Sequence, residues 1–261
     1  MNAPLVDLYV SPHLDDVVLS CGGRLKAASR EGRTATVVSV FSAPIPRNPA
    51  TLLAREYHAA MGIGADPYLR RREDRAALGL LGARPIHLEH HDCIYRTRAD
   101  GTPLVTSEQE IFRFDPAAEE ELALAISDDL IETVGVVRAA RVFVPLAVGR
   151  HRDHLLARWA AERALERLDG GIDVRYFEDV PYVLEAPDDL PAAAAGMACE
   201  PFPITEEELA ARVEAISRYA SQVAMLWHGG VGLAQAVRWV ARAAGGTRPA
   251  ERYWHPSSRT G

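Results

Sequence analysis

The sequence SPHLDDVVL, residues 11–19, lies between a segment with strand composition and a segment with helical periodicity. Residues 5–10 (LVDLYV) favour a buried strand, and apolar residues recur at helical spacing over residues 17–28. The turn between them carries one histidine and two adjacent carboxylates, His13, Asp15 and Asp16. In a parallel α/β sheet such turns lie at the carboxyl ends of strands, where ligands bind. We interpret this stretch as half of a metal site.

A second cluster, HRDH at residues 151–154, follows the apolar run 141–147 and opens a helix-like segment over residues 155–168. His151 and His154 are three residues apart, so a helix would place them on one face. The positive end of the helix dipole disfavours a protonated imidazole, and a metal needs the neutral ring. This cluster is therefore expected to supply the other half of the site.

Together, SPHLDDVVLSCGG and HRDH resemble the two signatures of the PIG-L/LmbE family of zinc-dependent N-deacetylases, usually written HPDDE and HPDH. The pair Arg70 and Glu73 and the segment 76–82 also resemble the arginine-bearing helix of that family. The resemblance spans about residues 5–185. Leu14 replaces the usual proline and Val17 the usual acidic residue, and neither change removes a ligand.

The resemblance implies that one Zn²⁺, or Fe²⁺ or another divalent ion in its place, binds to His13, Asp16 and His154. Catalytic zinc typically keeps three protein ligands and one open position for water. Asp15 then lies beside the metal and is expected to take a proton from the bound water as general base. The alternative interpretation of Asp15 and Asp16 is a helix N-cap with a neighbour that the dipole favours.

For His151 the resemblance implies that the ring stabilises the oxyanion or protonates the departing amine, with Asp153 orienting it. The alternative is a surface histidine at the start of a helix. Gly149 and Arg150 occupy a region where some family members present a tyrosine to the oxyanion, and none is present there. Either the metal and His151 suffice, or another donor fills the gap.

Arg70 and Asp92 match positions that contact the substrate in sugar-processing relatives, so we expect them at the rim of the pocket. The alternative for Arg70, which belongs to a run of arginines, is a solvated helix face. Residues 93–116 are polar and irregular, which favours a functional loop that overhangs the site. Glu178 and Asp179 end a strand and either line the pocket or cap a loop.

Length and composition predict one globular α/β domain. The chain has 261 residues, of which 48% are hydrophobic and 25% charged, as in ordinary soluble proteins. A formal net charge of -7 argues against a nucleic-acid or anionic-membrane partner. No signal pattern and no apolar run of about 20 residues is visible, which favours the cytoplasm. Lys26 is the one lysine among 29 basic residues, a bias that suggests a GC-rich bacterial genome.

We predict a doubly wound, mostly parallel, Rossmann-like sheet with helices on both faces and a C-terminal helical extension. Residues 1–185 form the catalytic α/β domain. Residues 186–261 form a linker and a helical extension packed on the same domain, because residues 185–203 are rich in proline, alanine and acidic residues. The helices of the extension are expected at residues 206–227 and 232–244.

The predicted function is metal-dependent hydrolysis of an N-acetyl or other N-acyl group on an amino sugar or glycoside, with zinc-bound water activated by Asp15. One alternative is a deacylase of a non-sugar amide, such as a natural-product intermediate. From another class comes a non-catalytic ligand-binding protein on the same fold, which would be expected to lose Asp15 or a ligand. The expected partner is a small N-acetylated molecule, and a homo-oligomer is possible.

Overall fold

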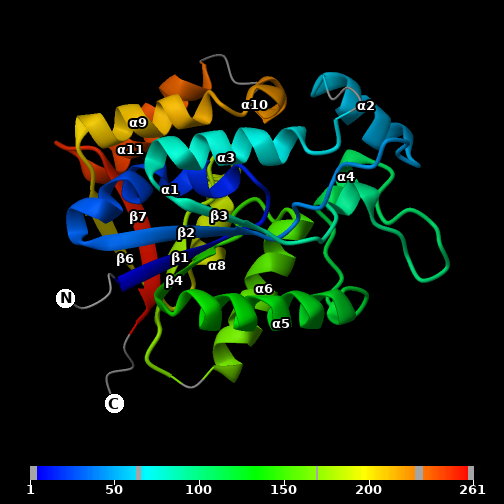
Figure 1. Ribbon diagram of the computed structural model, residues 1–261, viewed down its shortest axis with the longest axis horizontal. Helices are drawn as coiled ribbons and strands as arrows, with labels where there is room; N and C mark the ends of the chain where they lie inside the picture. Colours follow the sequence, from blue (N-terminus) through cyan, green and yellow to red (C-terminus); the bar gives the residue numbers. More distant parts are fainter. Residues whose placement is uncertain (1–4, 63–65, 169, 227–231, 258–261) are drawn as a thin grey trace.

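The computed structural model describes residues 5–62, 66–168, 170–226 and 232–257, and its centre is a seven-stranded sheet with the order β3-β2-β1-β4-β5-β7-β6 (Figure 1). The strands are β1 (Leu5–Ser11), β2 (Arg33–Ser39), β3 (Arg84–His87), β4 (Ala139–Pro145), β5 (Asp173–Phe177), β6 (Met197–Pro203) and β7 (Ala250–Pro256). The first five pair in parallel. The predicted doubly wound, mostly parallel sheet is confirmed.

Helices cover both faces of the sheet. The longer ones are α1 (Asp16–Ala27), α2 (Leu52–Ala60), α3 (Leu69–Leu81), α5 (Glu120–Val137), α6 (Arg152–Arg167), α9 (Glu206–Ile216), α10 (Ala220–Leu226) and α11 (Leu233–Gly245). Short helical turns are η1 (Ala28–Glu31), η2 (Cys93–Tyr95), α4 (Glu108–Ile111), α7 (Tyr182–Glu185), η3 (Pro187–Asp189) and α8 (Leu190–Ala193). In Figure 1, α1, α3 and α9 lie on one side of the sheet and α5 and α6 on the other.

The strand order reverses between β1 and β4, which are hydrogen-bonded neighbours. From β1 the chain proceeds outward to β2 and β3, and it later returns to build β4 and β5 on the other side. In such sheets the crevice at the carboxyl ends of the two diverging strands binds ligands. The turns after β1 and β4 carry the two histidine clusters, so the topology brings the clusters together.

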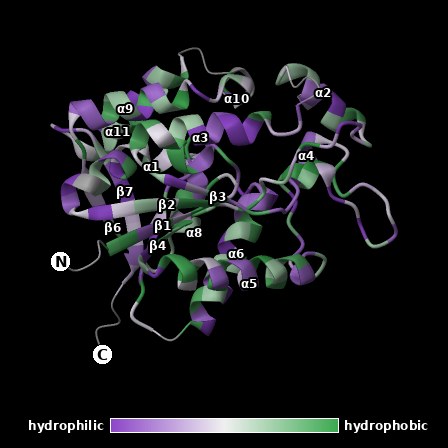
Figure 2. Cartoon of the chain, viewed as in Figure 1, coloured by the Kyte–Doolittle hydropathy of each residue, from purple (hydrophilic) through white to green (hydrophobic). Residues whose placement is uncertain are grey.

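The hydrophobic core lies between the central strands and the two helical layers. Leu8, Val38 and Val144 are fully buried, which suits strands covered on both faces. Figure 2 shows hydrophobic colours on these strands and mixed colours on the helices that cover them. Side chains beyond residue 185, such as Leu209 and Tyr253, belong to the same core. No helix in the described ranges has the length and apolar character needed to cross a bilayer.

The C-terminal part differs from the predicted linker and helical extension. Part of the predicted linker is the edge strand β6, and β7 inserts antiparallel between β5 and β6. Pro201 and Pro203 made residues 185–203 look like a linker, but an edge strand tolerates proline because one side of its backbone is unpaired. The predicted helix 206–227 is divided into α9 and α10, and residue 227 lies outside the described residues.

The predicted loop at residues 93–116 contains η2 and α4 and has a small core of its own with α2. We call α2 together with residues 93–114 the cap. Its buried apolar side chains are Leu53, Ala54, Cys93, Ile94, Leu104, Val105 and Ile111. Figure 1 shows α2 and α4 side by side beyond the sheet. The segment is therefore a packed element beside the site.

Candidate metal centre and active site

The turn after β1 is fixed by hydrogen bonds between its own residues. Ser11 Oγ donates to the carbonyl of His13 and accepts from Val17 N at 3.2 Å. The backbone N–H of His13 donates to Asp16 Oδ2 at 2.7 Å. These bonds hold the imidazole of His13 and the carboxylate of Asp16 on the same side of the turn.

The three expected metal ligands converge. His13 Nδ1 and His154 Nε2 each lie 3.2 Å from Asp16 Oδ2. The ligand atoms of His13, Asp16 and His154 all lie within 4.8 Å of one another, and the three residues are buried. Two overlapping groups also satisfy this distance, namely His13, His151 and Asp153, and Asp92, Cys93 and Asp153.

Hydrogen bonding singles out the first of these groups as the one that fits a cation. His154 Nε2 is buried and pairs with Asp16 Oδ2 at 3.2 Å without a well-formed hydrogen bond to a described residue, while His154 Nδ1 bonds Asp179 Oδ1 at 2.7 Å. His13 bonds Asp153 Oδ2 through Nε2 at 3.2 Å, so its Nδ1 is the nitrogen that faces Asp16. Metal-binding histidines characteristically donate their other N–H to a carboxylate. The donor set therefore fits a divalent cation such as Zn²⁺.

The ionisation of the metal-free site supports the same interpretation. Although burial opposes it, Asp16 and Asp179 raise the pKa of His154 to about 9. Asp153 and Asp16 likewise raise the pKa of His13 against the effect of burial. The pKa of Asp16 is held well below its usual value, because the two histidines outweigh its burial. The site thus favours positive charge on the two imidazoles beside Asp16, a charge that a bound cation would supply in their place.

Asp15 lies beside this group with one free oxygen. It occupies the N-cap position of α1, yet its side chain makes no capping hydrogen bond, so the interpretation of Asp15 as a helix cap is wrong. Asp15 Oδ2 is buried without a hydrogen-bond partner among the described residues, and Oδ1 lies 3.4 Å from Arg70 Nη2. Burial raises the pKa of Asp15, and the charge of Arg70 partly offsets this. A buried, unbonded carboxylate oxygen suits a proton acceptor.

His151 is the N-cap residue of α6, and its Nδ1 accepts the backbone N–H of Asp153 at 3.1 Å. Its ring lies 5.0 Å from that of His13 and 5.1 Å from that of His154. Burial, followed by the charges of these two rings, lowers the pKa of His151 well below its usual value. The ring is 8% exposed, so the surface alternative is wrong. A neutral ring that accepts at Nδ1 carries its proton on Nε2.

The carboxylate of Asp153 does not orient His151 as we expected. It contacts His13 through Oδ2, which also accepts Cys93 N at 2.9 Å, and its Oδ1 lies 2.7 Å from Arg96 Nη2. The ring of His151 is held instead by the backbone N–H of Asp153, which donates a hydrogen bond to its Nδ1. Although burial opposes it, the charges of Arg96 and His13 lower the pKa of Asp153.

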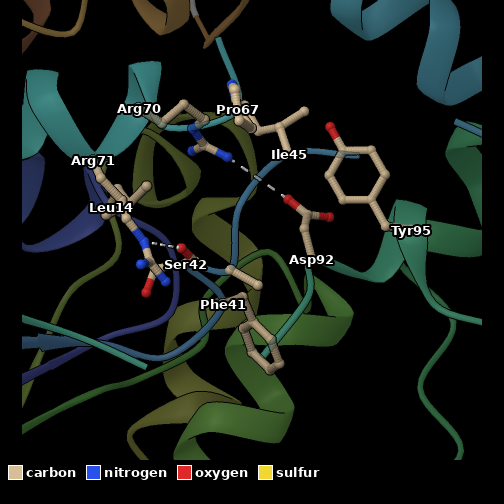
Figure 3. A pocket seen from close by; sticks show the side chains of 10 residues that line it. Leu14, Phe41, Ser42, Ile45, Pro67, Arg70, Arg71, Asp92 and Tyr95 are labelled. Carbon is tan, nitrogen blue, oxygen red and sulfur yellow. Dashed lines mark hydrogen bonds and ion pairs between the residues drawn. The ribbon is translucent and has the colours of Figure 1, made fainter. Parts of the chain in front are cut away.

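Arg70 and Asp92 lie together beside Asp15 and His13. Both line one pocket, and Figure 3 shows the Arg70 side chain extending toward the Asp92 carboxylate. Arg70 Nη1 lies 3.9 Å from Asp92 Oδ2, which in turn lies 3.6 Å from His13 Nε2. Their side chains are 12% and 17% exposed, so each keeps a small part of its surface open to solvent.

The other two arginines of the run have different roles. Arg71 donates from Nε to the Ser42 carbonyl at 2.6 Å, a structural bond that Figure 3 also shows. Arg72 is 57% exposed and pairs with Asp66 on the surface. The interpretation of a solvated helix face therefore holds for Arg72 alone.

Three further residues lie at the site and were not predicted from the sequence. Arg96 comes from the cap, and Glu119 lies between Arg96 and Arg152, at 3.4 Å and 3.0 Å. Tyr182 packs its ring 5.2 Å from that of His154 and 6.1 Å from that of His151. None of these residues is close in sequence to either histidine cluster, so no local pattern marks them.

Tyr182 occupies the space that a side chain at residue 149 would fill. A Cβ added to Gly149 would lie 2.7 Å from Cδ1 of the Tyr182 ring, and Gly149 has a φ of +79°. Tyr182 belongs to α7, so a tyrosine ring from a different part of the chain lies against Gly149.

The chain matches the PIG-L: GlcNAc-PI de-N-acetylase family over residues 8–165. It belongs to the PIG-L family. Every candidate metal ligand lies inside the matched stretch, whereas Asp179 and Tyr182 lie outside it.

Two curated relatives are 2'-N-acetylparomamine deacetylases. The one from Niallia circulans is 28% identical over 188 residues, which cover 67% of this chain and 66% of that protein. The one from Streptomyces fradiae is 36% identical over 179 residues, which cover 67% of this chain and 57% of that protein. The chain thus matches less than two thirds of the length of either relative. A solved structure of teicoplanin deacetylase in its zinc-inhibited form has a TM-score of 0.85 and 27% identity, covering 98% of this chain and 100% of that one.

Proposed function

We propose that this PIG-L protein is a zinc-dependent N-deacetylase that removes the acetyl group from an amino sugar within a glycoside. The observation that carries the proposal is the convergence of His13, Asp16 and His154, with His154 Nε2 facing Asp16 Oδ2 at 3.2 Å, beside the unbonded oxygen of Asp15. The relatives named for 2'-N-acetylparomamine and teicoplanin support a glycoside over a non-sugar amide. A non-catalytic binding protein would not need the unbonded Asp15.

His13, Asp16 and His154 would hold the ion, and two imidazoles with one carboxylate are a donor set that zinc accepts in hydrolases. When bound, the ion supplies a Lewis acid that polarises the amide carbonyl and acidifies water. Asp179 bonds Nδ1 of His154, and Asp153 bonds Nε2 of His13. In each ring this is the nitrogen that does not face Asp16. These two bonds fix the directions in which the other ring nitrogens, His154 Nε2 and His13 Nδ1, face the ion.

Asp15 accepts a proton from the attacking water at Oδ2 and returns it to the nitrogen of the departing amine. Its raised pKa favours both steps, because a carboxylate with a higher pKa is a stronger base at neutral pH and a better carrier of the proton afterwards. Breaking the C–N bond then releases acetate and a free amine.

His151 donates a hydrogen bond from Nε2 to the oxyanion. Its Nδ1 is occupied by the N–H of Asp153, and its low pKa keeps the ring neutral, so it serves as a hydrogen-bond donor and not as the acid for the amine. The ring of Tyr182 packs beside the rings of His151 and His154, and we assign its hydroxyl as a second donor to the oxyanion.

Arg70 and Asp92 bind hydroxyl groups of the sugar at the pocket mouth. Their side chains offer a charged donor and a charged acceptor within one pocket, as a polyhydroxylated ring requires.

The test combines metal analysis with release of acetate. The purified protein is expected to hold one divalent ion per chain and to release acetate from an N-acetylated aminoglycoside or glucosaminide. Asp15→Asn should keep the metal and the fold but lower turnover by about 10² to 10⁴-fold. Near-normal turnover of this variant, or a parent protein that binds metal and releases no acetate from either substrate, would overturn the proposal.

A further inference from the structure

Phe112 is an exposed aromatic residue at the edge of the active site. It follows α4 in the cap and is 46% exposed. Its ring lies 5.9 Å from the ring of His151 and 6.5 Å from the ring of Tyr182, edge to face in both pairs. The partly exposed ring of Phe112 therefore borders two side chains of the candidate site.

The cap holds Phe112 in this position. Ile111, the preceding residue, is buried in the small core of the cap, and Phe114 packs on Trp159 at 6.1 Å. Arg98 donates to the carbonyl of Leu104 at 3.0 Å and closes the cap on itself. Ile111 and Phe114 are thus packed against other parts of the protein, while Phe112 between them is exposed. The exposure of Phe112 therefore does not come from a loosely held loop.

The position of Phe112 distinguishes it from other exposed apolar side chains. Trp239 is 63% exposed on α11, and within the described part of the chain no ring contact joins it to a site residue, whereas the ring of Phe112 contacts that of His151. Single exposed apolar residues are common and need no explanation. An exposed aromatic ring in contact with a site histidine is different, because a bound substrate would cover it.

With the acetylated sugar at the ligand group, the part of a glycoside nearest to Phe112 would be the part beyond that sugar. The ligand group and Asp15 lie at the centre, and Arg70 and Asp92, which suit sugar hydroxyls, contact Asp15 and His13. Phe112 contacts the rings of His151 and Tyr182, and it is 46% exposed whereas the side chains of Arg70 and Asp92 are 12% and 17% exposed. An apolar ring at this place gains from stacking on an aromatic face, whereas a small polar group does not.

Resting on the proposed function, we propose that Phe112 is a specificity-determining residue that binds an apolar, ring-containing aglycone attached to the N-acetylated sugar. The parent enzyme is then expected to deacetylate para-nitrophenyl N-acetylglucosaminide about tenfold more efficiently than the methyl glycoside. The preference should lie mainly in KM, because the contact is remote from the bond that breaks.

The experiment measures kcat and KM for both glycosides in the parent, Phe112→Ala, Phe112→Tyr and the control Trp239→Ala. Phe112→Ala should raise KM for the aryl glycoside about tenfold and leave the methyl glycoside within about twofold. Phe112→Tyr, which keeps the aromatic face, should retain the preference, and Trp239→Ala should behave as the parent.

Equal losses on both glycosides in Phe112→Ala would overturn the inference, because they would mean that Phe112 only shields His151 from water. Unchanged kinetics on both would overturn it as well. In either case the release of acetate by the parent enzyme would leave the proposed function standing. A parent enzyme that releases acetate from neither glycoside nor from an N-acetylated aminoglycoside would overturn both.

Discussion

Asp179 Oδ1 accepts a hydrogen bond of 2.7 Å from His154 Nδ1 and thereby turns His154 Nε2 toward Asp16. The other oxygen of Asp179 accepts the backbone N–H of Val148 at 3.0 Å. One carboxylate at the end of β5 therefore fixes both the turn after β4 and the direction of a metal-binding nitrogen. The pair is fully buried, so water does not compete with it.

Asp179→Asn is expected to lower metal affinity by about 10 to 100-fold, because the histidine loses the carboxylate that orients it and raises its basicity. The matched control is Glu178→Gln. Glu178 contacts Arg252 and Trp254 and no site residue, so its change should leave metal affinity unaltered. Competition with a chelator gives the affinities. Equal affinities of Asp179→Asn and the parent would show that Asp179 serves only the fold.

Metal uptake by the metal-free protein should release protons. The pKa of His154 near 9 means that the ring is protonated at neutral pH, and a metal needs it neutral. Affinity is therefore expected to increase from pH 6 to pH 9, by about tenfold per pH unit for each proton displaced. Calorimetry in two buffers with different ionisation enthalpies measures the number of protons. A heat of binding that is independent of the buffer would contradict the protonated state of His154.

The sequence predicts the parts of the site that are local. The strand-to-helix turns, the three convergent ligands and Asp15 follow from two short motifs, because a doubly wound sheet brings the carboxyl ends of its central strands together. The motifs do not predict which residues form hydrogen bonds with these side chains. The sequence leaves open whether Glu178 and Asp179 line the pocket or cap a loop. Only the folded structure shows that the carboxylate of Asp179 is the one that bonds His154.

Long-range packing explains the remaining differences. Arg96 and Tyr182 approach the histidines from elements that are distant in sequence, so their positions depend on the folding of the cap and of α7. The strand β7 has a short, mixed sequence, and it joins the sheet by pairing with β5 on one side and with β6 on the other. Local patterns carry little information about which edge a strand will find.

Arg70→Gln should move the acid limb of the pH profile of kcat/KM to higher pH. Burial raises the pKa of Asp15 and the nearby charge of Arg70 lowers it, so removing that charge lets the pKa increase further. Asp15 then becomes the free base only at higher pH. Arg72→Gln is the control, since Arg72 is two residues away and faces solvent. A limb that stays in place in Arg70→Gln, with only KM increased, would limit Arg70 to substrate binding.

The residues after 185 are tied to the catalytic part by a buried ion pair. Arg212 Nη1 on α9 lies 3.1 Å from Glu251 Oε1 on β7, and the Arg212 side chain also donates to the carbonyl of Leu19. Glu251 accepts the backbone N–H groups of Gly23 and Arg24 at 2.8 Å and 2.9 Å. Both side chains therefore bond to α1, the helix that begins at the metal site.

Arg212→Met is expected to lower the free energy of unfolding by about 3–5 kcal/mol, because Glu251 is left as an unpaired buried carboxylate and the carbonyl of Leu19 loses its donor. The control is Arg218→Gln, which breaks the surface pair with Glu214 and should change stability by less than about 1 kcal/mol. Urea unfolding followed by fluorescence and by loss of metal measures both. One shared transition is expected, since α9 and β7 pack into the same core as β1. Two separate transitions, with only the second releasing metal, would show that residues 186–261 fold as an independent unit and that the ion pair is a contact between two domains.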